Sequence, residues 1–165
     1  MRNILLILLV GITCCKEPTK EKQIISFPEE KPIVKVKLTD LNDQPIDLEQ
    51  YKGQTVFVNF WATWCKPCLQ EMPSIDKAQE LLHKKGVIFL LASNESPDQI
   101  NEFKKGHNYN FNYVRLVNME ELNVEVLPTT YIFNPKGQLV LSETGYRKWD
   151  DIKNIEMILK ISNQK

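Results

Sequence analysis

The chain has 165 residues, of which 42% are hydrophobic and 25% are charged, so it can form about one folded domain with a core of useful size. Lys plus Arg and Asp plus Glu number 21 each, and this balance creates no overall field for nucleic acid, so we expect no nucleic-acid partner. The absence of an internal repeat and of a phosphate-binding glycine loop argues against a repeat protein and a P-loop enzyme.

The N-terminus has the features of an export signal. Arg2 precedes an apolar run over residues 4–12, which is too short for a membrane-spanning helix of about 20 residues but suits a secretory signal. A buried strand is the alternative, but no pairing partner for it is evident. The run ends on Cys14 and Cys15, and this resembles a bacterial lipoprotein signal. The resemblance implies that residues 1–15 are a signal peptide, that Cys15 (or Cys14) is lipidated, and that the protein is exported to the periplasmic side and anchored to the membrane.

The next expected elements are a tether and a β-hairpin. Residues 16–32 are charged, contain prolines and lack a clean period, as a tether does, and a folded domain is expected over residues 33–165. Residues 32–40 alternate apolar and polar side chains, like a half-buried strand. Turn-forming residues over 42–45 follow, so a hairpin is predicted there.

The rest of the chain alternates strands and helices. Residues 55–61, TVFVNFW, predict a central buried strand, and residues 66–85 a helix that Pro73 should kink. The later elements predicted, in chain order, are a strand over 86–93, a helix over 96–106, a strand over 127–133, a tight turn over 134–137, a strand over 138–145 and an amphipathic helix over 148–161.

This order of elements predicts an α/β fold. The strands before and after the first helix should pair in parallel, whereas the last two strands should form an antiparallel hairpin. We therefore expect a mixed central sheet flanked by helices on both faces, with an added N-terminal β-hairpin.

Cys65 and Cys68 form a CxxC pair that could bind a metal, close a structural disulfide or cycle between thiol and disulfide. A closed zinc site needs four ligands, and His83 and His107 are isolated in the sequence, so we expect no metal. Besides Cys14 and Cys15 the chain has no other cysteine, so it is not a scaffold stapled by several disulfides.

The position of the CxxC pair favours redox chemistry. Cys65 directly follows the central strand and begins a helix, where free N–H groups and the helix dipole favour a thiolate. Cys68 lies one turn later on the same face, within reach of its partner. Pro67 suits a first helical turn, and Lys66 adds positive charge. Cys65 is thus predicted to attack a substrate disulfide, and Cys68 to resolve the mixed disulfide.

Two separated stretches carry a resemblance to a known family. FWATWCKPC is similar to the active-site stretch of the thioredoxin superfamily, and VLPTTYIFNPKGQLV resembles its cis-proline loop and following hairpin. With the N-terminal hairpin, the EMP after Cys68 and the export signal, residues 33–163 resemble the TlpA/ResA-like extracytoplasmic proteins.

That resemblance implies a thioredoxin-like fold and thiol-disulfide oxidoreductase activity. The expected substrates are protein disulfides and thiols, with a role like that in cytochrome c maturation. A membrane electron donor would keep the protein reduced. We expect no cofactor besides the redox-active disulfide, and a monomer.

The resemblance also implies a substrate-binding surface. It places a cis bond between Leu127 and Pro128 and pairs the backbone at Leu127-Pro128-Thr129 with a substrate strand. An ordinary trans proline remains possible from the residues alone. Trp64 is expected beside the Cys65 sulfur, next to Lys66 and Pro67, whereas Trp61 should serve partly in the core.

One position departs from the ordinary thioredoxin pattern. Where those proteins carry a buried Asp in the central strand, this chain has Asn59, which cannot accept the proton of the inner cysteine. In the TlpA/ResA-like group an acidic residue three after the second cysteine lies near the site, and Glu71 matches it. From the sequence alone, Glu71 could equally be a solvated helix residue.

Two alternatives stay open at this stage. A thiol peroxidase would carry Thr three residues before the reactive cysteine, whereas Ala62 stands there and Thr63 is one position off. A non-catalytic module could bind a partner, or copper through the two cysteines. Related copper carriers add a late histidine, and the chain has none after Pro128.

Overall fold

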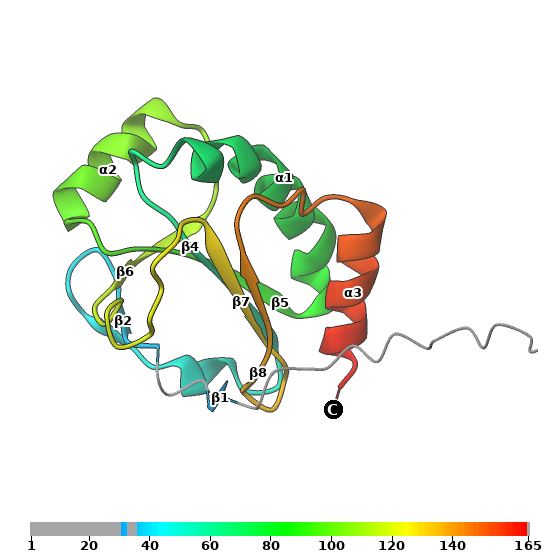
Figure 1. Ribbon diagram of the computed structural model, residues 1–165. Coiled ribbons are helices and arrows are strands. Elements are labelled where there is room, and N and C mark those ends of the chain that lie inside the picture. Colours follow the sequence, from blue (N-terminus) through cyan, green and yellow to red (C-terminus); the bar gives the residue numbers. More distant parts are fainter. Residues whose placement is uncertain (1–30, 33–35, 165) are drawn as a thin grey trace, which may run out of the picture.

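The structure is a computed structural model that describes residues 31–32 and 36–164. Within these residues the strands form one eight-stranded mixed sheet, in the order β1-β8-β7-β4-β5-β6-β2-β3 (Figure 1). The strands are β1 (Lys31–Pro32), β2 (Leu38–Thr39), β3 (Pro45–Ile46), β4 (Thr55–Phe60), β5 (Val87–Ser93), β6 (Asn112–Leu116), β7 (Thr129–Phe133) and β8 (Gln138–Thr144). The helices are α1 (Lys66–Leu82), α2 (Pro97–Gly106) and α3 (Ile152–Ser162), with 3₁₀ turns η2 (Leu48–Tyr51) and η3 (His83–Lys85).

Strand β4 is the centre of the sheet, as its composition predicts. All of its residues are buried, and it pairs in parallel with β5 and antiparallel with β7. Successive side chains alternate between two cores. Phe57 and the adjoining Trp61 belong to one cluster, and Val56 and Val58 belong to the other. A continuous apolar run is what a strand covered on both faces requires.

The three α-helices cover one face of the sheet, which differs from the expectation of helices on both faces. Buried residues of α1, α2 and α3 all join the cluster that contains Phe57, whereas Leu48 of η2 joins the opposite cluster. The connections β4-α1-β5 and β5-α2-β6 step across the sheet in the same direction, so right-handed crossovers put both helices on one side. Figure 1 shows α1 and α3 together, away from η2.

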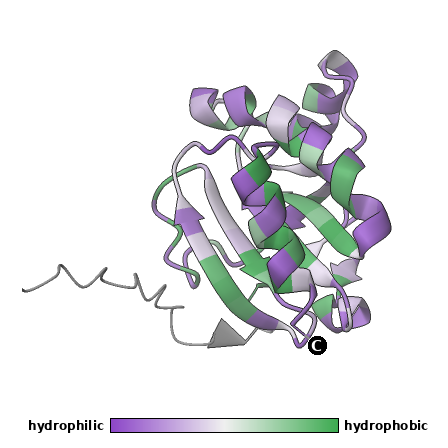
Figure 2. Ribbon diagram, turned by 90° about the vertical axis from the view of Figure 1, so that its right-hand side faces the viewer, coloured by the Kyte–Doolittle hydropathy of each residue, from purple (hydrophilic) through white to green (hydrophobic). Residues whose placement is uncertain are grey.

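Hydropathy follows this layering. In Figure 2, which looks at the side of the molecule that carries α3, hydrophobic residues run along the sheet, and hydrophilic and hydrophobic residues alternate along the helices. In α3 the residues facing the sheet include Ile155, Ile158 and Ile161, at the spacing of an amphipathic helix.

Besides the short β1, which lies at the end of the predicted tether and pairs with β8, the strand that the sequence analysis missed is β6. It pairs in parallel with β5 and antiparallel with β2, so it joins the β2-β3 hairpin to the main sheet. In the segment before and within β6, Asn108, Asn110 and Asn112 alternate with aromatic residues. Because asparagine is depleted in β-strands, this composition did not predict a strand. Neighbouring strands, rather than its own composition, stabilise this segment.

The other predicted elements are present with small changes at their ends. The β2-β3 hairpin pairs Leu38 with Ile46, and α1 runs without a break through Pro73 before η3 extends it. Helix α3 begins at Ile152 rather than at residue 148, and Trp149 is buried against Phe57 instead. None of the helices in the described part of the chain is both long and apolar enough to cross a membrane.

Candidate active site

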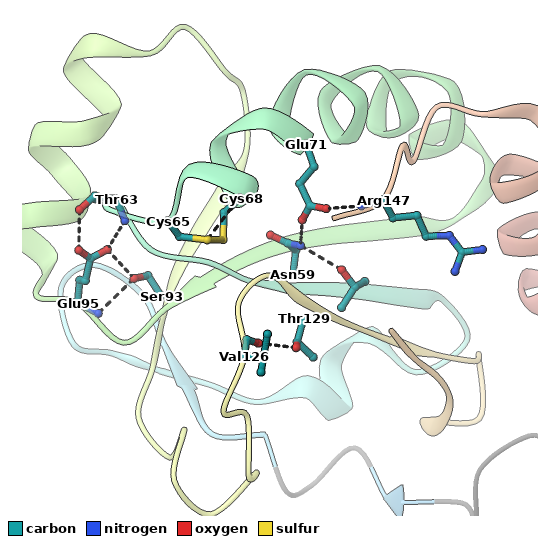
Figure 3. The surroundings of a disulfide bond; sticks show 11 residues. Asn59, Thr63, Cys65, Cys68, Glu71, Ser93, Glu95, Val126, Thr129 and Arg147 are labelled. Atoms are coloured by element: carbon teal, nitrogen blue, oxygen red, sulfur yellow. Dashed lines mark hydrogen bonds between the residues drawn. A yellow bond between two sulfur atoms is a disulfide. The ribbon is translucent and has the colours of Figure 1, made fainter. Parts of the chain in front are cut away.

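Cys65 and Cys68 are joined by a disulfide at the start of α1, with an S–S distance of 2.00 Å (Figure 3). Strand β4 delivers the chain to this point, and Cys65 occupies the N-cap of the helix. The Cys65 sulfur accepts a hydrogen bond from the Cys68 N–H at 3.3 Å. The two cysteines therefore bond to each other, as redox use of the pair requires.

The surroundings of Cys65 suit a sulfur that changes charge. The free N–H groups of the first turn and the positive end of the helix dipole favour an anion at the N-cap. Lys66 and Pro67 are exposed in this first turn. Cys65 is 4% exposed and Cys68 is 1% exposed, and the adjacent Trp64 is 72% exposed. A partner can therefore approach from the side of Cys65 and Trp64.

A proline loop lies next to the end of β4. The Leu127-Pro128 peptide bond is cis, so the predicted isomer is confirmed. Thr129 pairs with Phe60 across the β4-β7 ladder, which puts the loop beside the segment that leads to Cys65.

Two hydrogen bonds fix the shape of the loop. The Thr129 hydroxyl donates to the Val126 carbonyl at 2.7 Å, and the Gly145 N–H donates to the Pro128 carbonyl at 2.7 Å. Thr129 is buried, so its side chain shapes the loop rather than facing solvent.

Glu71 lies one turn after Cys68 on α1 and is fully buried. One carboxylate oxygen accepts from the Asn59 side-chain amide at 2.7 Å, and the other accepts from the Arg147 backbone N–H at 3.1 Å. Because Glu71 is buried, the interpretation of Glu71 as a solvated helix residue is wrong. Asn59 also donates to the Thr130 hydroxyl at 3.0 Å, which ties the carboxylate to strands β4 and β7.

Burial raises the pKa of Glu71 to about 7, although the hydrogen bonds from Arg147 and Asn59 act in the opposite direction. A carboxyl with such a pKa can be protonated or ionised near neutral pH, so it can take up and release a proton there.

The segment between β8 and α3 donates backbone hydrogen bonds to residues of α1 at the site, and the sequence analysis did not predict these contacts. Arg147 supplies its N–H to Glu71, and the Trp149 N–H donates to the Ser74 hydroxyl at 3.0 Å. Tyr146 is exposed in the same segment. No sequence signal identified this contact, because Glu71 and Arg147 are 76 positions apart in the chain. Cys14 and Cys15, the candidates for lipidation, lie outside the described residues.

Comparison with known proteins assigns the chain to a family. Residues 30–142 match the model of the AhpC/TSA family. The chain is 34% identical over 149 residues to thiol-disulfide oxidoreductase ResA of Bacillus subtilis, covering 87% of this chain and 82% of that protein. It is 32% identical over 161 residues to ResA of Geobacillus thermodenitrificans, covering 93% of this chain and 91% of that protein.

Solved structures share the fold. A putative thiol:disulfide interchange protein DsbE from Chlorobium tepidum superposes with a TM-score of 0.72 at 20% identity, over 82% of this chain and 99% of that one. The pneumococcal exposed lipoprotein thioredoxin Etrx1 of Streptococcus pneumoniae gives a TM-score of 0.56 at 25% identity, over 80% of this chain and 98% of that one.

These likenesses agree with the geometry of the site. The thioredoxin-like fold is confirmed, and the relatives are named as enzymes rather than as binding modules. The chain thus belongs to the AhpC/TSA family and, within it, to the thioredoxin-like thiol-disulfide oxidoreductases related to ResA.

Proposed function

We propose that this enzyme reduces disulfide bonds in exported proteins, using the Cys65–Cys68 pair. The observation that carries the proposal is the disulfide at the N-terminus of α1, beside the cis-proline loop and the exposed Trp64. A redox pair needs a stabilised thiolate, a partner sulfur within reach and an open approach, and this arrangement is compatible with all three.

In the proposed reaction the Cys65 thiolate attacks one sulfur of the substrate disulfide. A bond forms between that sulfur and Cys65, and the other substrate sulfur leaves as a thiolate. Cys68 then loses its proton and attacks the Cys65 sulfur, which closes the Cys65–Cys68 disulfide and releases the second substrate thiolate. The substrate gains two electrons and the enzyme loses two.

Glu71 is proposed to accept the proton of Cys68. Asn59 cannot take a proton at neutral pH, and Glu71 stands one helical turn beyond Cys68. A carboxyl with a pKa of about 7 is matched to this task. The proton passes directly or through one water, and it returns to solvent once the substrate has left.

The substrate is proposed to lie across the loop at Leu127-Pro128-Thr129, with its backbone pairing there as an added strand. Trp64, Lys66 and Pro67 would border the substrate on the side of α1. Val126 and Tyr146 are 53% and 54% exposed, and they would extend the apolar border.

The proposed site of action is the periplasmic side of the membrane, with lipid on Cys15 or Cys14 as the anchor and a membrane protein as electron donor. The proposal rests on the N-terminal sequence, and it is supported by the name of Etrx1 as an exposed lipoprotein. A disulfide in a cytochrome c precursor is the substrate that the family resemblance suggests.

A trapping experiment tests the proposal. The Cys68→Ser protein cannot resolve the mixed disulfide, so it should accumulate one with a disulfide-bearing test protein such as insulin, while Cys65→Ser should form none. In the reduced wild type, Cys65 should be alkylated faster than Cys68 at neutral pH. Turnover that survives in Cys65→Ser, or equal alkylation of the two cysteines, would overturn the assignment. Partners trapped in cells by Cys68→Ser identify the substrates.

A further inference from the structure

A second carboxylate lies next to the active-site segment and has no part in the chemistry described above. The two Glu95 oxygens accept from the Thr63 backbone N–H at 2.8 Å and from the Thr63 hydroxyl at 2.6 Å. The oxygen that binds the Thr63 N–H also accepts from the Ser93 hydroxyl at 3.0 Å. Figure 3 shows Glu95 and Ser93 below Thr63, and the disulfide to the right of Thr63.

The topology explains how residues 32 positions apart come together. Strands β4 and β5 are parallel neighbours, so the segments that leave their carboxyl ends lie side by side at one edge of the sheet. Thr63 follows β4 and Glu95 follows β5. The Ser93 hydroxyl accepts from the Glu95 N–H at 3.2 Å, which fixes the turn that carries the carboxylate.

Thr63 is two residues before Cys65, and the residue between them has little packing of its own, because Trp64 is 72% exposed. The backbone bonds around this segment join Trp61 to Ala92 and Cys65 to Ala62. The hydrogen bonds that hold Thr63 itself go to Glu95. The carboxylate therefore restrains the backbone that leads into the Cys65 sulfur.

The effect of this restraint on the position of Cys65 differs between the disulfide form and the dithiol form. In the disulfide form, the bond to Cys68 already ties Cys65 to α1. In the dithiol form that bond is absent, and the hydrogen bonds from Thr63 to Glu95 hold this part of the segment to the turn after β5. We propose that Glu95 is a positioning residue for thiol-disulfide exchange, holding Thr63 so that the Cys65 sulfur stays in place while the disulfide is open. The inference rests on the proposed redox cycling of the Cys65–Cys68 pair.

A measurable consequence follows for the redox equilibrium. Without Glu95, the segment gains freedom in the dithiol form and must be ordered again when the disulfide closes. Glu95→Ala should therefore shift the equilibrium toward the dithiol by about tenfold, which makes the reduction potential less negative by about 30 mV. The closing reaction should slow by a similar factor, since the ordering precedes bond formation. Reduction of the disulfide form by dithiothreitol should change less than about twofold, because the disulfide itself holds the segment there.

Matched variants distinguish the effect of holding Thr63 in position from the effect of the negative charge on Glu95. In Glu95→Gln, the amide oxygen can accept from the Thr63 N–H, and the amide nitrogen can donate to the Thr63 hydroxyl, so the contact persists without the negative charge. Thr63→Val removes the hydroxyl bond but keeps the backbone bond and the side-chain shape, and it should shift the equilibrium by about threefold. Glu102→Ala removes an exposed carboxylate of α2 that pairs with Lys105, and it serves as the control.

The experiment equilibrates each full-length protein with reduced and oxidised dithiothreitol at neutral pH, and measures the closing and opening rates separately. Circular dichroism confirms the fold, and if Glu95→Ala does not fold, Thr63→Val decides the question alone. The expected result is a shift in Glu95→Ala and Thr63→Val, with Glu95→Gln and Glu102→Ala within about twofold of the wild type.

Two results would overturn the proposal. An equal shift in Glu95→Gln and Glu95→Ala would assign the effect to charge rather than position. An unchanged equilibrium in Glu95→Ala, or in Thr63→Val where only that protein folds, would remove any role for the contact. The equilibrium does not depend on which cysteine attacks the substrate or on what the substrate is. A failure here is therefore distinct from a failure of the proposed physiological function.

Discussion

At the scale of single residues, the site depends on hydrogen bonds between buried polar groups. The Asn59 side-chain amide donates hydrogen bonds to Glu71 and to the Thr130 hydroxyl. The Arg147 N–H donates to the other oxygen of the Glu71 carboxylate. An acidic group is thus held on α1 rather than on the central strand, where ordinary thioredoxins carry an Asp. Burial keeps the pKa of Glu71 high, and the hydrogen bonds keep the ionised form accessible.

The first prediction concerns the charge of Glu71 in the reduced protein. Ionised Glu71 disfavours a second negative charge nearby, so the carboxyl and the thiols should titrate as a coupled set. Glu71→Gln removes this charge, and it should move thiol ionisation to lower pH and slow the resolution step. The measurement is thiolate absorbance against pH in both proteins, with the exposed Glu80→Gln on the same helix as control. Superimposable curves together with unchanged turnover would mean that the proton acceptor lies elsewhere.

The second prediction concerns stability of the disulfide form, in which the cysteines do not titrate. Glu71 ionises near pH 4.5 in the unfolded chain but near 7 in the folded protein, because burial raises its folded-state pKa. Between these values the folded state holds a proton that the unfolded state has released, so stability falls as pH rises through the window. The loss attributable to Glu71 should reach at most about 3 kcal/mol above pH 7.

Urea unfolding of the disulfide form across this pH range measures the effect. The wild type should lose stability relative to Glu71→Gln as pH rises from about 4.5 to above 7. Parallel stability curves for the two proteins would contradict a raised pKa at Glu71.

At the scale of elements, local signals determine most of the helices. Helix α2 begins with a capping box, in which the Ser96 hydroxyl accepts from the Gln99 N–H and the Gln99 side chain accepts from the Ser96 N–H. Pro97 occupies the first turn, and Ile100 and Phe103 enter the core. The start of α2 could be predicted from the sequence, because the contacts of the cap span at most a few residues.

The third prediction follows from this cap. Ser96→Ala leaves the N–H groups of the first turn without their side-chain acceptor and should lower the free energy of unfolding by about 1 kcal/mol. Ser96→Thr keeps the hydroxyl and should stay close to the wild type. The measurement is urea unfolding at constant pH, and equal midpoints for Ser96→Ala and the wild type would show that the cap does not contribute.

At the scale of the whole molecule, the proposed anchor separates membrane attachment from the folded domain. The described domain begins well after the predicted signal, so the lipid and the redox site are expected to act independently. More than one acyl chain is needed for firm attachment, because a single chain binds a membrane only marginally.

The fourth prediction concerns this anchor. In a bacterial host, the mature protein should start at Cys15 or Cys14 and carry lipid on that residue, as mass spectrometry can determine. Replacing both cysteines by Ser should either release the domain from the membrane fraction or leave an uncleaved signal. Cys68→Ser keeps the signal intact and serves as the control for fractionation. A mature N-terminus beyond Lys16 without lipid would refute the lipoprotein signal.

Sequence alone determined the features that depend on local chemistry. The apolar run of β4, the cysteine at the start of α1, the cap of α2 and the turn before β8 all follow from neighbouring residues. The family motifs added the cis bond at Pro128 and the candidacy of Glu71, and the structure confirmed the cis isomer.

The burial and the hydrogen-bond partners of these features depend on the tertiary structure. Whether Glu71 is buried depends on Arg147, 76 positions away, and the restraint on Thr63 depends on Glu95, 32 positions away. Strand β6 lies between β5 and β2, and both of these partners come from other parts of the chain. Propensity and periodicity describe the chain over a few turns, whereas burial and hydrogen bonding at this site come from segments that only the fold brings together.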